Sequence, residues 1–329
     1  MRRVTIALSS AGRRVELMDC FRQDAADLGI EARILALDSE PELSPACLLA
    51  DGKWKVPPCA DRTFIPFLGD LARKTEIDLL VPTIDTELPA FAAGKEYLER
   101  ECGIGLVMVS SPAVVKLARE KCQLMLTLGD GGIPVPVTVR ATDAPSQARR
   151  LRGPVILKPV DGSSSRGIRR LPSVDALTDV DRGASGYIVQ ELLDGPEYTV
   201  NVFLGPTGEL EAAVPHRRLA VREGEVSKAV TERNPALIGL AERLGKVLAP
   251  LGARGPLCYQ AILQEGAPRV FELNARFGGG YPLAHRAGAH FTRRLLEWAV
   301  GLPGSSLTGW DDGVLMLRYD RSVFSEMQR

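Results

Sequence analysis

The sequence predicts an α/β protein (α+β overall) in which an N-terminal parallel-sheet domain precedes a region of antiparallel strands. In the N-terminal third, apolar runs of strand length alternate with segments of helical periodicity, which is the pattern of successive βαβ units. In the second half, strand-like runs follow one another across short turns, as in antiparallel hairpins. A chain of 329 residues is also too long for one small core, so we expect two or three domains.

The first predicted domain covers residues 1–110 and contains the parallel sheet. Its strands are expected at residues 4–9, 32–37, 77–82 and 105–109, and its helices at residues 13–28, 64–74 and from Leu88 onward. Strands that are separated by helices in this way should be parallel and covered by those helices. The turn at residues 9–14 lacks the glycines of a dinucleotide-binding fold, which disfavours NAD as a ligand.

The second and third predicted domains cover residues 111–189 and 190–329. In the second, Ser111-Pro112 opens one long helix that ends near Leu128, and two strands flank a serine- and glycine-rich turn as a hairpin. The remaining strands are expected to pair antiparallel. The expected strands are at residues 155–160, 168–171, 187–192, 198–204, 211–217, 257–263, 269–274 and 314–319, with helices at residues 234–251 and 291–300.

Composition excludes several classes of protein. Lys plus Arg and Asp plus Glu both number 41, so the formal net charge is zero and we predict no nucleic-acid or anionic-membrane partner. No apolar run is long enough to cross a bilayer. The six cysteines include no C-x-x-C pair and the chain has three histidines, so we predict reduced thiols in a cytoplasmic protein, with neither a zinc site nor a disulfide framework.

Three polar residues near the end of the predicted strand 269–274 give the first chemical signal. Glu272 and Asn274 alternate with Leu273, so both oxygen-bearing side chains lie on one face, and Arg276 continues that face if the strand extends so far. Carboxylate and amide oxygens suit Mg²⁺, and a guanidinium suits a phosphate or a carboxylate. This row of three side chains, Glu272, Asn274 and Arg276, therefore indicates a site suited to the chemistry of a nucleotide.

A lysine in an apolar strand gives the second signal. Lys158 lies within Val-Ile-Leu-Lys-Pro, where burial of an ammonium group is costly unless an anion meets it; a lysine at an exposed sheet edge is the alternative. The turn at residues 161–167 offers backbone N–H groups and serine hydroxyls to phosphate oxygens. Residues 190–197 form a hinge with Glu191 and Glu197 that could hold an adenine and a ribose, although an ordinary turn with two solvated glutamates is the alternative.

Taken in order, these segments resemble the ATP-grasp superfamily, and in particular its carbamoyl-phosphate-synthase-like and amino-acid (carboxylate–amine) ligase branch. The resemblance covers roughly residues 110 to 290 and rests on Glu120-Lys121, Ile156-Leu157-Lys158-Pro159, residues 161–167, Gln190-Glu191-Leu192-Leu193, Glu197, Tyr259-Gln260-Ala261-Ile262 and Phe271-Glu272-Leu273-Asn274-Ala275-Arg276. It implies a two-lobed ATP-grasp fold, with a small lid subdomain in residues 111–189 and the metal site in residues 190–329.

The resemblance also implies roles for individual residues, with Lys158 and Arg276 as the catalytic pair. Lys121, Lys158 and a lid of Ser163, Ser164 and Ser165 would bind the ATP phosphates, and Glu191, Leu193 and Glu197 would bind the adenine and the ribose. Gln260, Glu272 and Asn274 would hold two Mg²⁺ ions, for which Mn²⁺ could substitute. Arg276 would bind an acyl phosphate. Many relatives have an acidic residue where this chain has Gln260, so we expect the first metal ion to bind less tightly.

The implied activity is the ATP- and Mg²⁺-dependent joining of a small-molecule carboxylate to an amine. The carboxylate would take the γ-phosphate to form an acyl phosphate, and the amine would displace phosphate to leave an amide or peptide bond. The alternatives are a phosphotransferase like carbamoyl phosphate synthase, a biotin-dependent carboxylase, and a catalytically inactive nucleotide-binding module. A homodimer is also compatible with the sequence, through apolar positions such as Trp54, Phe64 and Phe67.

Two segments of the N-terminal domain are candidates for contact with the substrates. Asp85 or Glu87 follows the third main strand and could meet a substrate amine, although Thr86 could instead cap the next helix. Arg13 and Arg14 could hold a carboxylate or a phosphate, because cations are unfavourable at the start of a helix. Surface arginines are the alternative.

Histidine-containing segments later in the chain are further candidates. His216, Arg217 and Arg218 could line the cleft over the phosphates. His285 follows the glycine run and could lie on the side of the amine acceptor, more so than His290. Both histidines could equally be polar helix residues.

Overall fold

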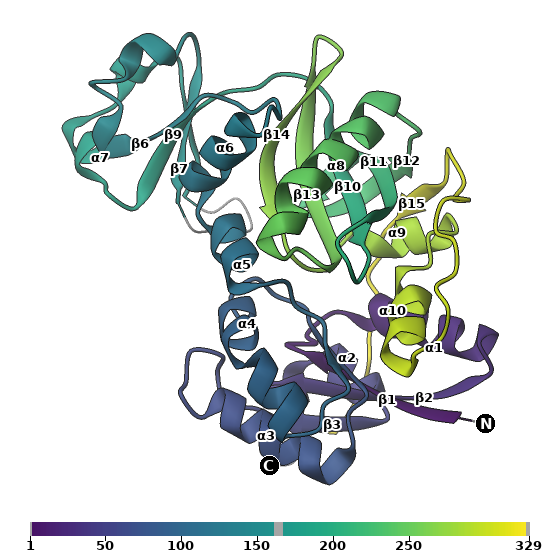
Figure 1. The fold of residues 1–329 in the computed structure, drawn as a ribbon. Coiled ribbons are helices and arrows are strands. Elements are labelled where there is room, and N and C mark those ends of the chain that lie inside the picture. Colours follow the sequence, from purple (N-terminus) through teal and green to yellow (C-terminus); the bar gives the residue numbers. More distant parts are fainter. Residues whose placement is uncertain (1, 161–166, 327–329) are drawn as a thin grey trace.

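Figure 1 shows the computed structural model of the protein, which describes residues 2–160 and 167–326. Over these residues the chain forms a five-stranded, a four-stranded and a six-stranded β-sheet. Every strand pair in the first sheet is parallel, and every pair in the other two sheets is antiparallel. The predicted fold class is therefore confirmed, while the three domain boundaries stay predictions.

The N-terminal sheet has the strand order β3-β2-β1-β4-β5. Its strands are β1 (Arg2–Ser9), β2 (Ile30–Asp38), β3 (Gly52–Lys55), β4 (Leu79–Pro82) and β5 (Leu106–Val107), and its helices are α1 (Val15–Asp27), α2 (Pro45–Leu49), α3 (Phe64–Thr75) and α4 (Leu88–Glu96). The central strand β1 is buried over its last six residues. The sequence does not predict β3, because this edge strand is largely exposed and its Gly-Lys-Trp-Lys sequence contains no apolar run.

The single long helix predicted from Ser111 to Leu128 is wrong, because the helix is interrupted at Glu120. The backbone at Glu120 has φ −101° and ψ 88°, which separates α5 (Pro112–Arg119) from α6 (Lys121–Asp130). The Glu120 carboxylate leaves the helix direction and pairs with Arg140 Nη2 at 2.7 Å. The break places Lys121 in the first turn of a new helix, where its side chain is buried.

The four-stranded sheet forms a small lobe at the upper left of Figure 1, with the strand order β6-β9-β7-β8. Its elements are β6 (Thr138–Arg140), β7 (Val155–Pro159), β8 (Arg169–Leu171), β9 (Tyr187–Glu191) and the short helix α7 (Asp179–Gly183). β9 pairs with β6 and β7, whereas the next strand of the chain belongs to the large sheet. The chain therefore passes from one sheet to the other just after Glu191.

The six-stranded sheet has the order β14-β13-β10-β11-β12-β15. Its strands are β10 (Glu197–Leu204), β11 (Leu210–Arg222), β12 (Glu225–Thr231), β13 (Gly255–Gln264), β14 (Ala267–Asn274) and β15 (Leu315–Leu317), and the accompanying helices are α8 (Pro235–Leu248), α9 (Tyr281–Arg286) and α10 (Phe291–Val300). The predicted β13–β14 hairpin is confirmed, with its turn at residues 265–266. The sequence does not predict β12 or α9.

Two large apolar clusters join the N-terminal sheet to the six-stranded sheet. β1 contributes Ala7 to one cluster and both Ile6 and Leu8 to the other, because successive residues of a strand point to opposite faces. The small lobe has a cluster of its own. Phe64 lies in the first cluster and is only 1% exposed, so it is not available for the suggested dimer contact. Trp54, which was suggested for the same contact, is 38% exposed.

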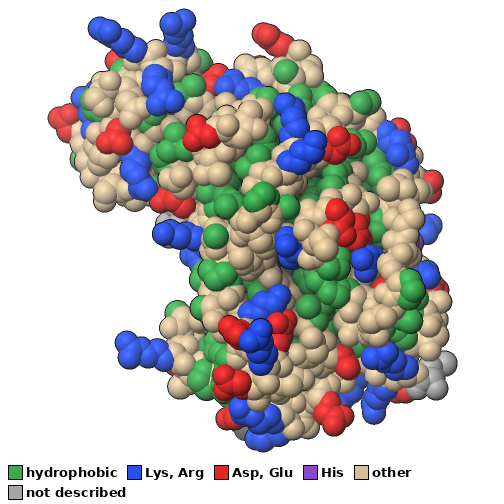
Figure 2. All heavy atoms as spheres, viewed as in Figure 1, with side chains coloured by type: hydrophobic (Ala, Val, Ile, Leu, Met, Phe, Trp, Pro, Cys, Tyr) green, Lys and Arg blue, Asp and Glu red, His purple; other side chains and the backbone are tan. Residues whose placement is uncertain are grey.

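The surface carries charges of both signs. Figure 2 shows acidic and basic side chains interspersed over the visible face, with no large area of one sign. This distribution is what a formal net charge of zero leads one to expect. Among the described residues, no helix combines the length and the apolar character that a membrane span requires.

Candidate active site

A cavity of about 460 Å³ lies between the four-stranded and the six-stranded sheets. Its walls come from β7 and β9, from the connection between β9 and β10, and from β10, β11, β13 and β14. Seven of the predicted site residues line it, namely Lys121, Lys158, Glu191, Leu193, Glu197, Gln260 and Glu272. Residues from both lobes thus converge on one space. The predicted lid residues Ser163, Ser164 and Ser165 lie outside the described residues.

Two buried lysines supply positive charge to this cavity. Lys158 and Lys121 are 7% and 8% exposed, so neither is the lysine of an exposed sheet edge. Burial lowers the pKa of Lys158 to about 8; Glu272 opposes this effect and Lys121 adds to it. Lys158 Nζ also lies 5.5 Å from the ring centroid of Phe271, and Lys121 Nζ donates to the Val160 carbonyl at 3.3 Å. A desolvated pair of cations is suited to an anionic ligand such as a phosphate chain.

The connection between β9 and β10 is fastened to β14 and contains Leu193, which lines the cavity. The Glu191 carboxylate is bound by both Arg269 Nη atoms, at 2.7 and 2.8 Å, and accepts from the Val137 amide at 3.2 Å, so it fastens the connection to β14. Leu193 is 8% exposed, and within the described part of the chain its N–H and C=O form no hydrogen bond. Unpaired backbone groups at such depth are uncommon and are suited to the edge of an adenine.

Glu197 forms an ion pair across the cavity wall. Its Oε1 lies 2.9 Å from Arg218 Nη1, and burial raises its pKa while Arg218 opposes that effect. The Arg218 side chain is 6% exposed, and its Nε is buried without a hydrogen-bond partner among the described residues. Of the three consecutive residues 216–218 that were expected at the cleft, Arg218 therefore lines the cavity.

Glu272, Asn274 and Gln260 form a group of hard-oxygen donors beside the lysines. Gln260 and Glu272 are partners on β13 and β14, next to a β-bulge that follows Gln260. The Asn274 amide nitrogen donates to Glu272 Oε1 at 3.0 Å, while its oxygen accepts from Arg276 Nη2 at 3.4 Å. One carboxylate and two amide oxygens fit the preference of Mg²⁺, although ligation by Asn274 requires its amide to turn the oxygen toward Glu272.

Arg276 extends this row toward the N-terminal sheet. Its Nη2 and Nε lie 2.6 and 3.2 Å from Asp85 Oδ2, so Asp85 has an arginine as its partner. Arg14 lies close to this pair, and its Nη2 is 3.5 Å from Glu225 Oε1. Burial lowers the pKa of Arg14, and the positive charge of the nearby Arg276 lowers it further. Two arginines therefore meet at the carboxyl ends of β1, β4 and β14.

Glu87 has a different role from the predicted contact with a substrate amine. It is fully buried, and its Oε2 accepts from the Ser9 and Ser10 hydroxyls, each at 2.7 Å. Its Oε1 accepts from the amides of Thr83 and Ile84 at 2.7 and 3.2 Å. Burial raises the pKa of Glu87, and these four donors oppose that effect. Glu87 joins the loops after β1 and β4.

Replacing Glu87 with alanine is expected to lower the free energy of unfolding by about 2 to 4 kcal/mol, because buried donors lose their acceptor. Urea denaturation would measure this change. The matched control is Glu96→Ala on the same helix, where the carboxylate is 74% exposed and should contribute no more than about 0.5 kcal/mol. Equal effects of the two substitutions would contradict the role given to Glu87.

Two of the other predicted substrate residues face away from the cavity. Arg13 is exposed, and its Nη1 lies 4.0 Å from Glu223 Oε2 in an exposed ion pair. Arg217 is also exposed, because it alternates with His216 along β11 and therefore points to the opposite face of the sheet. The period-2 pattern of residues 216–218 places Arg218 on the same face of β11 as His216 and Arg217 on the opposite face.

The remaining two candidates are buried histidines. The Asn201 amide nitrogen lies 3.2 Å from His216 Nδ1, and burial lowers the pKa of His216 to about 3, so the ring is neutral. Its Nε2 has no partner among the described residues, and a Cβ atom on Gly280 would approach it to 2.7 Å. His285 lies elsewhere, in contact with Asp24 of α1.

Two family models match the chain. Residues 6–107 match the model described as PylC-like, N-terminal domain, and residues 184–318 match the model described as ATP-grasp in the biosynthetic pathway with Ter operon. Residues 184–318 therefore form an ATP-grasp domain. The second match contains the β9–β10 connection and the whole row from Gln260 to Arg276. ATP-grasp enzymes use ATP together with Mg²⁺, and the oxygen donors described above are suited to that pair.

Solved structures share this ATP-grasp fold at low sequence identity. The L-amino acid ligase from Bacillus licheniformis superimposes with a TM-score of 0.68 and 18% identity, over 91% of this chain and 75% of that chain. The N5-carboxyaminoimidazole synthetase from Staphylococcus aureus, complexed with ADP, gives a TM-score of 0.73 and 15% identity, over 96% of this chain and 81% of that chain. At such identities the likeness establishes the fold and no more.

Among curated relatives, the chain is 34% identical over 96 residues to a D-alanine–D-alanine ligase from Ectopseudomonas mendocina (strain ymp). That alignment covers 27% of this chain and 31% of the ligase. The curated relatives that this chain matches are aligned over between 31% and 51% of their own lengths. Their activities and substrates are therefore a guide to proposals for this chain.

Proposed function

We propose that the protein is an ATP- and Mg²⁺-dependent carboxylate–amine ligase, which joins amino-acid-like small molecules through an amide or peptide bond and releases ADP and phosphate. One observation supports this most strongly. The oxygen donors Glu272 and Gln260 line the same cavity as Lys121 and Lys158, and the row that begins at Glu272 continues to Arg276 at the N-terminal sheet. A nucleotide in the cavity would therefore direct its phosphates toward Arg276 and the carboxyl ends of β1 and β4.

The nucleotide would lie along the cavity in the order of its contacts. The free backbone groups of Leu193 would bind the adenine edge, and Glu197 with Arg218 would meet the ribose and the phosphates. Lys121 and Lys158 would bind the phosphate chain, and Glu272, Gln260 and Asn274 would hold two Mg²⁺ ions. When bound, Mg²⁺ neutralises charge on the phosphate oxygens.

The acid would place its carboxylate at Arg276. Arg276 and Arg14 both lie here, and the Arg318 guanidinium belongs to the same charged group, since the Arg14 pKa responds to both neighbours. Arg318 Nε is buried without a hydrogen-bond partner among the described residues, and its Nη2 donates to the Gly279 carbonyl. Arg14, Arg276 and Arg318 are paired with Glu225, Asp85 and Glu16 respectively, so an anionic substrate would share these guanidinium groups with their carboxylate partners or displace the partners.

The proposed reaction has two steps. A carboxylate oxygen of the acid attacks the γ-phosphorus, the bond from that phosphorus to the β,γ-bridging oxygen breaks, and ADP leaves. The amine nitrogen then attacks the carbonyl carbon of the acyl phosphate, the carbon–oxygen bond to phosphate breaks, and the nitrogen loses a proton. The described residues contribute position and charge: Lys158 at the transferred phosphoryl group and Arg276 at the acyl oxygens.

The experiment that tests this proposal is a screen of acid–amine pairs for ADP release, followed by mass analysis of the products. We expect continued turnover of ATP to ADP only when both substrates are present, with a product whose mass equals acid plus amine minus water. AMP and pyrophosphate as products would overturn the proposal. Tight ATP binding with no ADP release from any pair would instead favour a catalytically inactive nucleotide-binding module.

A further inference from the structure

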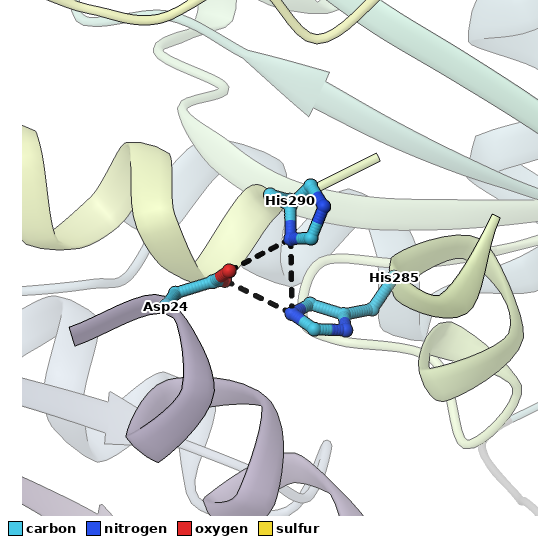
Figure 3. Close-up of side chains that lie close together, drawn as sticks. All are labelled: Asp24, His285 and His290. Atoms are coloured by element: carbon cyan, nitrogen blue, oxygen red, sulfur yellow. Dashed lines mark hydrogen bonds and ion pairs between the residues drawn. The ribbon is translucent and has the colours of Figure 1, made fainter. Parts of the chain in front are cut away.

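A second group of chemically reactive side chains lies apart from the cavity. Figure 3 shows Asp24 of α1, His285 of α9 and His290, which immediately precedes α10, pointing toward one another. Asp24 Oδ2 lies 3.0 Å from His285 Nε2, and Asp24 Oδ1 lies 2.7 Å from His290 Nδ1. The two ring nitrogens are 3.2 Å apart. None of the three residues lines the cavity of the proposed active site.

The three contacts form a closed triangle that protons alone do not satisfy. Each contact needs one proton between its two atoms, whereas two neutral rings offer at most two N–H groups at these positions. If both ring nitrogens carry a proton toward Asp24, the nitrogens face one another across 3.2 Å as two donors. A cation between the three side chains would accept a lone pair from each ring nitrogen and from one carboxylate oxygen.

The dimensions suit a tetrahedral transition-metal ion. Zinc binds imidazole nitrogen and carboxylate oxygen at about 2.0 to 2.2 Å, so that two ligand atoms of one tetrahedral ion are roughly 3.3 Å apart. His290 Nδ1 lies 2.7 Å from Asp24 Oδ1 and 3.2 Å from His285 Nε2, and one ligand atom from each of the three residues lies within 4.8 Å of the other two, so an ion would need only small shifts of these side chains. Two imidazoles and one carboxylate are a set that prefers zinc and its neighbours to Mg²⁺.

The surroundings hold Asp24 in place and leave one side open. Asp24 Oδ2 also accepts from the Thr292 hydroxyl and from the Arg293 amide, the latter at 2.9 Å, so the carboxylate is oriented by the first turn of α10. Such outer hydrogen bonds are typical of ligands that bind metals. The side chains of Asp24 and His285 are 0% and 5% exposed, whereas that of His290 is 32% exposed, which gives an ion a route from solvent.

We propose that Asp24, His285 and His290 bind a divalent transition-metal ion, zinc above all, with three protein ligands and a fourth position open to water. The ion would tie α1 of the N-terminal sheet to α9 and α10, which pack against it near the C-terminal end of the chain. Because the ligands come from both ends of the chain, the ion would stabilise the packing of these ends. Sequence spacing does not predict this site, since Asp24 lies far from both histidines in sequence.

The test uses the full chain, purified without a histidine tag, in millimolar Mg²⁺ so that Mg²⁺ occupies the oxygen donors around Glu272. We expect one equivalent of zinc by elemental analysis, a visible spectrum typical of tetrahedral coordination when Co²⁺ replaces zinc, and a thermal midpoint that falls on addition of a chelator. His290→Gln should weaken zinc binding at least tenfold in a competition titration with a chromophoric chelator. Because the His290 side chain is 32% exposed, we expect the variant to fold.

The control is Glu272→Gln, which changes the proposed Mg²⁺ site and should leave zinc binding unchanged. Equal zinc affinity of the wild type and His290→Gln, or loss of zinc in Glu272→Gln alone, would overturn the proposal. In that event the three side chains form a hydrogen-bonded network without metal. The result does not depend on the ligase activity, because every readout concerns zinc and none concerns ATP turnover.

Discussion

Replacing Glu272 with glutamine is expected to lower amine-dependent ADP release by about a hundred- to a thousandfold, since removal of one group that stabilises transition-state charge typically has an effect of this size. Glutamine preserves the shape of the side chain and can still accept from Asn274, which now lies 3.0 Å from Glu272 Oε1. The substitution therefore removes charge at the metal face with little change in packing. Steady-state turnover with the acid–amine pair found in the screen is the measurement.

A binding measurement makes the same prediction testable without knowledge of the substrates. For the wild type, affinity for a fluorescent ADP analogue should rise on addition of Mg²⁺, and for Glu272→Gln this dependence on Mg²⁺ should be lost. Glu265→Gln is the matched control, because Glu265 lies in the exposed turn of the same hairpin. Undiminished turnover in Glu272→Gln, with the Mg²⁺ dependence intact, would rule out the metal role.

The parts of the site that the sequence predicts are those that depend on local periodicity. Alternation along one strand places Glu272 and Asn274 together, and the structure joins them by a hydrogen bond. A lysine within an apolar strand predicts a buried cation, and Lys158 is 7% exposed. In both cases the information lies within a few neighbouring residues, where the geometry of a strand fixes which side chains share a face.

The parts that the sequence does not predict depend on contacts between distant segments. Glu87 follows a strand end, as a substrate-binding residue could, yet its oxygens are used by Ser9, Ser10 and the backbone of its own loop. The interruption of the helix at Glu120 is accompanied by its pairing with Arg140, which no helical periodicity reveals. Tertiary partners decided these outcomes against reasonable local expectations.

The pairing of Arg276 with Asp85 connects the two halves of the proposed reaction. Arg276 follows the oxygen donors Glu272 and Asn274 just after the end of β14, while Asp85 follows β4 of the N-terminal sheet. A substrate carboxylate that binds Arg276 must share it with Asp85 or displace Asp85, and a displaced Asp85 would be free to meet an ammonium group. The same contact could therefore serve an acid first and an amine afterwards, which agrees with the order of the two proposed steps.

Replacing Lys158 with methionine is expected to make the nucleotide-free protein more stable and its nucleotide binding weaker. Burial lowers the pKa of Lys158 to about 8 from 10.5, so the charged lysine opposes folding at neutral pH. One pKa unit corresponds to about 1.4 kcal/mol, and the gain in unfolding free energy should be on the order of 1 to 3 kcal/mol at pH 7. Affinity for ADP should fall roughly 10- to 100-fold, because a charge-assisted contact with a phosphate is lost.

The pH dependence of this stability difference identifies its cause. Between pH 8 and 10.5 the unfolded chain binds the proton of Lys158 more readily than the folded protein does, so the stability of the wild type should rise with pH across that interval. The advantage of Lys158→Met should be largest below pH 8 and shrink as the pH approaches 10.5. Denaturant unfolding of both proteins at several pH values measures it, with Lys246→Met, at an exposed lysine of α8, as the control. If Lys158 only stabilised the fold, Lys158→Met would be less stable than the wild type, which is the opposite sign. If Lys158→Met bound ADP with the affinity of the wild type, Lys158 would be excluded from the phosphate site.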